Sequence, residues 1–130
     1  MMAIFGAPVY HENHRELAIR ASLEMIELLR TFNEQRAVLG KPQIEIGIGI
    51  ATGRVIAGYT GTQHRATYTC VGDTVNVAAR IQDHTKVAAK PVLLDQYTRE
   101  GLPVGINTED LGPITFKGKQ QSIHVYAISV

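Results

Sequence analysis

Hydrophobic and polar positions follow a strand-like pattern most clearly over residues 44–51. The isoleucines at 44, 46, 48 and 50 fall on one face, and Glu45, Gly47, Gly49 and Ala51 fall on the other. This alternation predicts a β-strand. Its two glycines leave room for another backbone to approach closely.

Helical spacing of apolar residues predicts a long helix over residues 13–39. Asn13 and Glu16 have the spacing of a capping box, and Gly40 followed by Pro42 ends the helix. The apolar stripe, which we expect to be core, comprises Ala18, Ala21, Met25, Leu28, Leu29 and Phe32.

Shorter patterns predict the remaining elements. Residues 2–5 are read as a buried strand, 54–58 as a second apolar run, 59–66 as a loop or arm, and 67–71 as a strand rich in β-branched and aromatic residues. Later segments are a strand over 91–95, a short helix over 96–100, a weak strand over 106–111 broken by Gly112-Pro113, and a hairpin formed by 114–117 and 123–128. The order predicts an α/β or α+β fold with a mixed sheet.

Composition and charge are those of an ordinary globular domain. The 130 residues are 45% hydrophobic and 19% charged, with a net charge of +1, so we expect one domain and no nucleic-acid partner. No apolar run approaches the roughly 20 residues of a membrane helix. Cys70 is the only cysteine, which excludes an internal disulfide and favours a reducing, cytoplasmic compartment, leaving open a membrane anchor elsewhere in the parent protein.

Chemistry-bearing residues gather where the strand 67–71 turns into a second helix, expected to run to about residue 85. Gly72 permits the turn, and Asp73 is predicted as the N-cap. Asn76 and Arg80 are four residues apart, so they share one helix face near the helix start. Donors beside a helix N-terminus favour an anion such as phosphate.

Each of these residues also has an ordinary interpretation. Arg80 could be a solvated residue paired with Asp83 or Asp73. Asn76 suits a first helical turn, and Thr69 suits any strand. Cys70 is expected to be a small packed side chain on the opposite face of the strand from Thr69.

Four segments together resemble the catalytic domain of class III nucleotide cyclases, the adenylyl and guanylyl cyclase family. They are residues 2–6, residues 46–53, residues 68–80 with the sequence Tyr-Thr-Cys-Val-Gly-Asp-Thr-Val-Asn-Val-Ala-Ala-Arg, and residues 116–119. The resemblance implies a ferredoxin-like α+β cyclase fold that is incomplete at its N-terminus. Residues 1–130 would then be the C-terminal part of a single catalytic domain.

The resemblance also implies roles for individual residues. Asn76 and Arg80 match the pair that steadies the ribose and the transferring phosphoryl group. Thr69 matches the base-reading position, and Lys117 matches the lysine that holds the terminal phosphates. Lys119 lies one register away from Lys117, so this choice depends on the family pattern.

Two Mg²⁺ or Mn²⁺ ions are implied by the same resemblance. The two aspartates that bind them in the family, and a base-reading lysine, would fall upstream of Met1. The five histidines of this chain lack the spacing of a metal site. The family works as a homodimer with shared sites, so this segment would supply the base-reading and transition-state half and is expected to be inactive alone.

Thr69 leaves the substrate open. The resemblance is to the Thr-type adenylyl cyclases, which implies conversion of ATP to cyclic AMP and pyrophosphate. A hydroxyl can accept from an adenine amino group or donate to a guanine carbonyl, so a guanylate cyclase remains an alternative. The other alternative is a degenerate cyclase-like domain that binds nucleotide or a partner and regulates an attached module.

Overall fold

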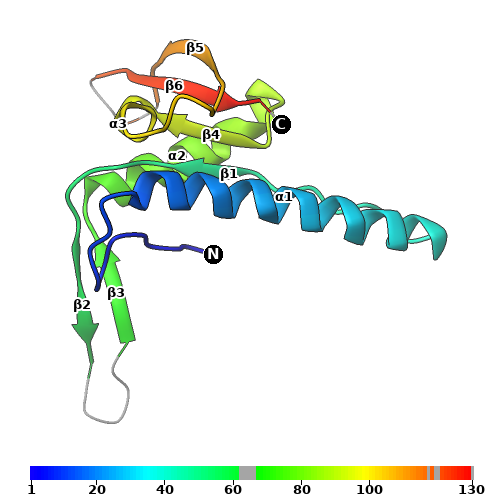
Figure 1. Ribbon diagram of the computed structural model, residues 1–130, viewed down its shortest axis with the longest axis horizontal. Coiled ribbons are helices and arrows are strands. Elements are labelled where there is room, and N and C mark those ends of the chain that lie inside the picture. The colour runs from blue at the N-terminus through cyan, green and yellow to red at the C-terminus, as the bar shows by residue number, and fades with distance from the viewer. Residues whose placement is uncertain (62–66, 117, 119–120, 130) are drawn as a thin grey trace.

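The computed structural model describes residues 1–61, 67–116, 118 and 121–129 (Figure 1). Four strands form one sheet in the order β1-β4-β6-β5, and β2 pairs with β3 separately. Strand β1 is parallel to β4 and the other pairs are antiparallel, so the fold is α+β with a mixed sheet, as predicted. The elements are α1 (His14–Val38), β1 (Ile48–Ile50), β2 (Ile56–Thr60), β3 (Thr67–Val71), α2 (Asp73–Ala88), β4 (Val92–Asp95), α3 (Gln96–Glu100), β5 (Thr108–Ile114) and β6 (Ile123–Ile128).

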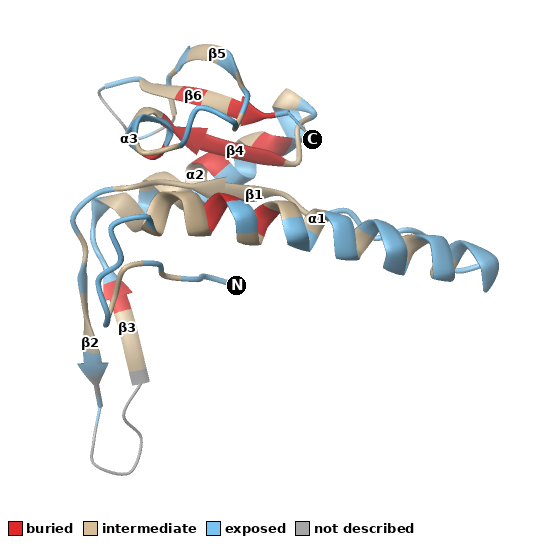
Figure 2. Cartoon of the chain, viewed as in Figure 1, coloured by how far each residue is buried: buried red, intermediate tan, exposed pale blue. Residues whose placement is uncertain are grey.

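Strand β4 is the centre of the hydrophobic core, because all four of its residues are buried (Figure 2). Val92 and Leu94 pack with Ile19 of α1, whereas Leu93 packs with Ile81 of α2. Successive strand residues point to opposite faces. The sheet therefore lies between two apolar clusters, one completed by α1 and the other by α2.

Helix α1 has the predicted position, but the predicted core stripe is only partly right. Ala18 is buried, whereas Met25, Leu28 and Phe32 are 37%, 64% and 46% exposed. Figure 2 shows the exposed second half of α1 running past the end of the sheet, so the sheet does not cover these side chains. The predicted capping box is wrong as well, since Asn13 makes no side-chain capping hydrogen bond.

Strand β1 is shorter than the eight residues predicted. Only Ile48–Ile50 pair with β4. Ile44 is held instead by the Asn33 side chain of α1, which donates to its carbonyl and accepts from its N–H, both at 2.8 Å. These backbone groups are satisfied without a neighbouring strand, so an alternating sequence need not become a ladder.

The predicted strand over residues 2–5 is wrong. These residues have no regular secondary structure, and Met2 and Phe5 are 55% and 39% exposed. A strand needs a hydrogen-bonded neighbour, and none of the described strands pairs with this segment.

Gly112-Pro113 does not break a strand, contrary to the prediction. Strand β5 continues through both residues with a bulge between Asp110 and Gly112. Gly112 has a φ of +79°, and β5 is an edge strand, where the missing N–H of Pro113 costs little. A hairpin forms between β5 and β6 with Ile114 opposite Ile123, so its second strand is as predicted. Its first strand ends at Ile114 instead of covering 114–117: residues 115 and 116 are not in a strand, and Lys117 lies outside the described residues.

Strands β2 and β3 form a hairpin that stands away from the sheet and helices (Figure 1). The bounds of β3 are those predicted, and β2 begins two residues later than the apolar run suggested. Residues 62–66 of the predicted arm lie outside the described part of the chain. Among the described helices, none is long and apolar enough to cross a bilayer.

Candidate functional site

The strand–turn–helix that carries the predicted site is β3, Gly72 and α2. Gly72 has a φ of +148° and occupies the N-cap position, so the helix begins at Asp73. The predicted N-cap at Asp73 is thus one residue too late. Asp73 stands in the first turn, where a carboxylate still interacts favourably with the helix dipole.

Close contact with β1 fixes the position of α2. A Cβ added to Gly49 would overlap the backbone of Ala78 and Gln82, and one added to Gly47 would overlap the Thr85 side chain. The prediction that these glycines admit another backbone is confirmed. The helix rests directly on the strand, which fixes the height of its outer face above the sheet.

A hollow of about 850 Å³ opens beside the first half of α2. Its lining comes from the ends of β1 and β4, the start of α3, and the end of β5 with the start of β6. Thr52, Thr74, Arg80, Asp95 and Gly118 are among its lining residues. Its lining mixes polar and apolar groups and includes the cationic Arg80.

Arg80 enters this hollow from α2. The side chain is half-buried, and its Nη1 atom is shielded from solvent with no hydrogen-bond partner among the described residues. A Cβ added to Gly118 would lie 3.6 Å from Nη2, so the turn before β6 passes close to the guanidinium. A shielded, unsatisfied cationic donor is costly unless an anion completes it.

Thr69 and Asn76 do not line the hollow. Asn76 is exposed on α2, and the Thr69 hydroxyl on β3 donates a long 3.5 Å hydrogen bond to the Gly58 carbonyl across the hairpin. Lys117 lies outside the described residues. The structure therefore brings Arg80 to the hollow and leaves the other described candidates on the adjoining strand and helix. Cys70 is buried, as expected.

Asp95 is a component of this hollow that the sequence reasoning missed. The side chain is 4% exposed, and its Oδ1 accepts from Thr98 N at 2.9 Å, Thr98 Oγ1 at 2.7 Å and Thr52 N at 3.4 Å. Burial raises the pKa of Asp95, and these hydrogen bonds oppose that rise. An Asp directly before a short helix with Thr three residues later was the available signal, since that is an N-cap pattern.

The described residues do not fit a site for two divalent metal ions. No group of three or more His, Cys, Asp or Glu side chains comes together among them. Asp73 and Asp95 both line the hollow, but Oδ1 of Asp95 is already an acceptor for three donors. We therefore assign no metal ligand to this segment.

Residues 1–129 match the family described as the adenylate and guanylate cyclase catalytic domain. The chain is 31% identical over 128 residues to adenylate cyclase 1 of Rhizobium meliloti, covering 98% of this chain and 19% of that protein. Among solved structures, the adenylyl cyclase CyaB from P. aeruginosa is similar with a TM-score of 0.84 and 25% identity, over 97% of this chain and 65% of that one. The guanylyl cyclase Cya2 is similar with a TM-score of 0.82 and 28% identity, over 95% and 62%.

The chain therefore belongs to the class III nucleotide cyclase catalytic domain family. It spans about a fifth of the length of the Rhizobium relative. The similar proteins include both adenylyl and guanylyl cyclases, so they show the family and leave the choice between ATP and GTP open.

Proposed function

We propose that this chain is the base-reading and phosphate-binding part of an adenylate cyclase domain, which converts ATP to cyclic AMP and pyrophosphate. The observation that carries the proposal is Arg80, whose shielded Nη1 has no hydrogen-bond partner among the described residues in the hollow beside the start of α2. Relatives that cover almost the whole chain are named adenylate cyclases.

The reaction joins the ribose 3′-oxygen to the α-phosphorus and expels pyrophosphate. Negative charge on the transferring phosphoryl oxygens needs fixed donors, and the planar guanidinium of Arg80 can donate two parallel hydrogen bonds to them. Asn76 would orient the ribose, Thr69 would read the purine, and Lys117 would hold the terminal phosphates. Each residue acts here by positioning or by charge, without forming a covalent intermediate.

The proposed active unit is a homodimer with composite sites. Two Mg²⁺ or Mn²⁺ ions would supply further neutralisation of phosphate charge when bound, held by carboxylates other than those described here. Family members crystallised with GTP or with an ATP analogue support nucleotide binding by this fold. A subunit lacking Arg80 should therefore be complemented by one that lacks only the metal-binding carboxylates.

The test is an assay of the complete catalytic domain with ATP and with GTP in Mn²⁺. We expect cyclic AMP from ATP. Arg80→Ala should lower kcat by about 100- to 1,000-fold, which is the usual effect of removing one fixed donor to a developing negative charge. Lys86→Ala is a matched control, because Lys86 is an exposed cation on the same helix outside the hollow.

Two alternatives are distinguished from this proposal by separate criteria. Similarity to the guanylyl cyclase Cya2 and the permissive hydroxyl of Thr69 favour a guanylate cyclase, which would form product from GTP only. The second alternative, a nucleotide-binding regulatory domain, would lack the aspartate pair and the base-reading lysine that the family has upstream of the position of Met1. No product from either nucleotide would refute the enzyme proposal.

A further inference from the structure

The β2–β3 hairpin, which carries Thr69, joins the rest of the molecule at two places. Gly72 leads from β3 into α2, and residues 51–55 lead from β1 into β2. Within the hairpin, Ile56 lies opposite Val71 and Gly58 lies opposite Thr69. Any change in how these two connections sit against each other would move Thr69 relative to Asn76 and Arg80.

The Thr74 side chain joins the two connections. The Thr74 hydroxyl, in the first turn of α2, donates to the Arg54 carbonyl at 3.0 Å. A Cβ added to Gly53 would lie 2.5 Å from Thr74 Oγ1, and one added to Gly72 would lie 3.4 Å from the Arg54 carbonyl oxygen. The two connections are therefore closely packed at this point, and the hydrogen bond opposes their separation.

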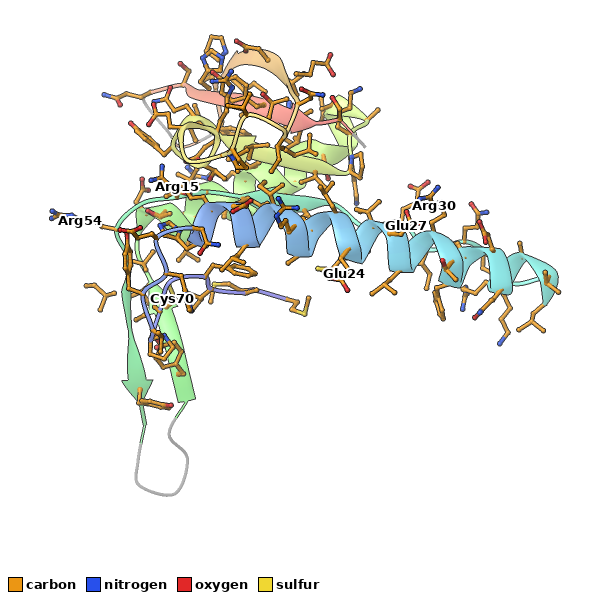
Figure 3. The ribbon with its side chains drawn as sticks, viewed as in Figure 1. Arg15, Glu24, Glu27, Arg30, Arg54 and Cys70 are labelled. Atoms are coloured by element: carbon orange, nitrogen blue, oxygen red, sulfur yellow. The ribbon has the colours of Figure 1, made fainter. Side chains whose placement is uncertain are left out.

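The Arg54 side chain takes no part in this contact. Figure 3 shows it pointing away from the molecule where β2 leaves the body, and the residue is exposed. The carbonyl faces inward toward α2 instead. Thr74 therefore binds the backbone of residue 54, and a substitution of the Arg54 side chain would leave this hydrogen bond in place.

The other end of the same turn is held by the Asp95 network. The Thr52 hydroxyl lies 2.7 Å from the Thr98 hydroxyl, and Thr98 in turn donates to Asp95. Thr98 is fully buried. Residues 52–54 are thus fixed to α3 at one end and to α2 at the other, along the wall of the hollow that contains Arg80.

We propose that Thr74 is a positioning residue for nucleotide choice: its hydroxyl holds the β1–β2 turn on α2 and so sets where Thr69 stands relative to Asn76 and Arg80. This inference rests on the proposed function for its kinetic consequence, although the contact itself does not. A neutral hydrogen bond of ordinary strength corresponds to about a 2- to 10-fold change in an equilibrium constant. Loss of this contact should weaken base discrimination by a factor in that range.

The experiment uses the complete catalytic domain with Thr74→Val, which keeps the side-chain volume and removes the donor, and Thr74→Ser, which keeps the donor. Kinetics with ATP and GTP give the ratio of the two kcat/KM values. We expect Thr74→Val to reduce this ratio about 2- to 10-fold, mainly by raising KM for the preferred nucleotide, and Thr74→Ser to restore it. Hydrogen exchange should become faster in peptides covering 51–60 and 67–71, while the β4–β6 peptides stay unchanged.

Gly53→Ala provides a second perturbation should Thr74→Val fail to fold. The added methyl group would displace the Thr74 hydroxyl without removing it, so the same shift in nucleotide ratio and hairpin exchange is expected. An equal fall in activity with both nucleotides, with hairpin exchange unchanged, would overturn the inference.

The two proposals fail in distinguishable ways. If the unmodified domain turns over neither nucleotide, the proposed function is refuted, and the exchange measurement still decides whether Thr74 fixes the hairpin. If the domain is active but Thr74→Val changes neither ratio nor exchange, the role of Thr74 is refuted and the cyclase function stands.

Discussion

Replacing Asp95 tests the hydrogen-bond network at the end of β4. In Asp95→Ala, the buried Thr98 N–H loses its acceptor, and the Thr98 hydroxyl keeps only its contact with the Thr52 hydroxyl. Loss of an N-cap costs about 1 kcal/mol, and a buried donor left unsatisfied costs about 1–3 kcal/mol. Both figures describe the loss of the acceptor for the Thr98 N–H, so we expect the free energy of unfolding to fall by about 1–3 kcal/mol.

Asp95→Asn separates charge from hydrogen bonding, because the amide oxygen can still accept from Thr98. Burial raises the pKa of Asp95 in the folded chain above its unfolded value. The stability linked to this proton is complete below the unfolded pKa near pH 4 and is lost as pH rises through the folded pKa. The asparagine variant has no such loss, so it should gain stability relative to the parent as pH rises from about 4 to 8.

Urea unfolding followed by far-UV circular dichroism, repeated across this pH range, measures both effects. The reasoning would be wrong if Asp95→Ala unfolded at the same urea concentration as the parent. It would also be wrong if the difference between Asp95→Asn and the parent stayed constant with pH.

Two further predictions concern the packing of α2 against the sheet. Gly49→Ala should prevent normal folding or lower the free energy of unfolding by at least about 1–3 kcal/mol, because the methyl group would overlap the α2 backbone. Gly58→Ala is the control: its methyl group would enter open space, so its free energy of unfolding in chemical denaturation should stay close to that of the parent. Ile81→Ala removes a fully buried side chain and should cost about 2–5 kcal/mol in the same measurement, while Val87→Ala, at a residue 78% exposed, should change it by less than about 0.5 kcal/mol.

The sequence predicted most of the fold because local patterns decide those parts. The bounds of β3 and α3 were predicted residue for residue, and the glycine face of β1 lies against α2. Errors arose where tertiary surroundings overrode the pattern. Ile44 alternates like a strand residue, yet an asparagine side chain satisfies its backbone. Phe32 fits an apolar stripe, yet it is 46% exposed.

The candidate site was predictable only in part for a similar reason. Arg80 and Asn76 belong to a contiguous motif, so a sequence can reveal them together. Asp95 meets Thr52 across 43 residues of chain, and that contact exists only after β1 and β4 pair. Thr74 contacts the carbonyl of Arg54, and the sequence pattern does not show where that backbone carbonyl will lie in the fold.

The close contact of Gly47 and Gly49 with α2 has a consequence for changing nucleotide preference by design. Because the backbone of α2 contacts the backbone of β1 there, α2 and its Arg80 cannot move closer to the sheet. A larger residue at 47 or 49 would push α2 away from the sheet. The hairpin is adjustable, since its angle to α2 depends on a few polar contacts at residues 52–54. Libraries intended to shift purine choice should therefore vary residues 51–60 and 67–71 and keep residues 47–49 unchanged.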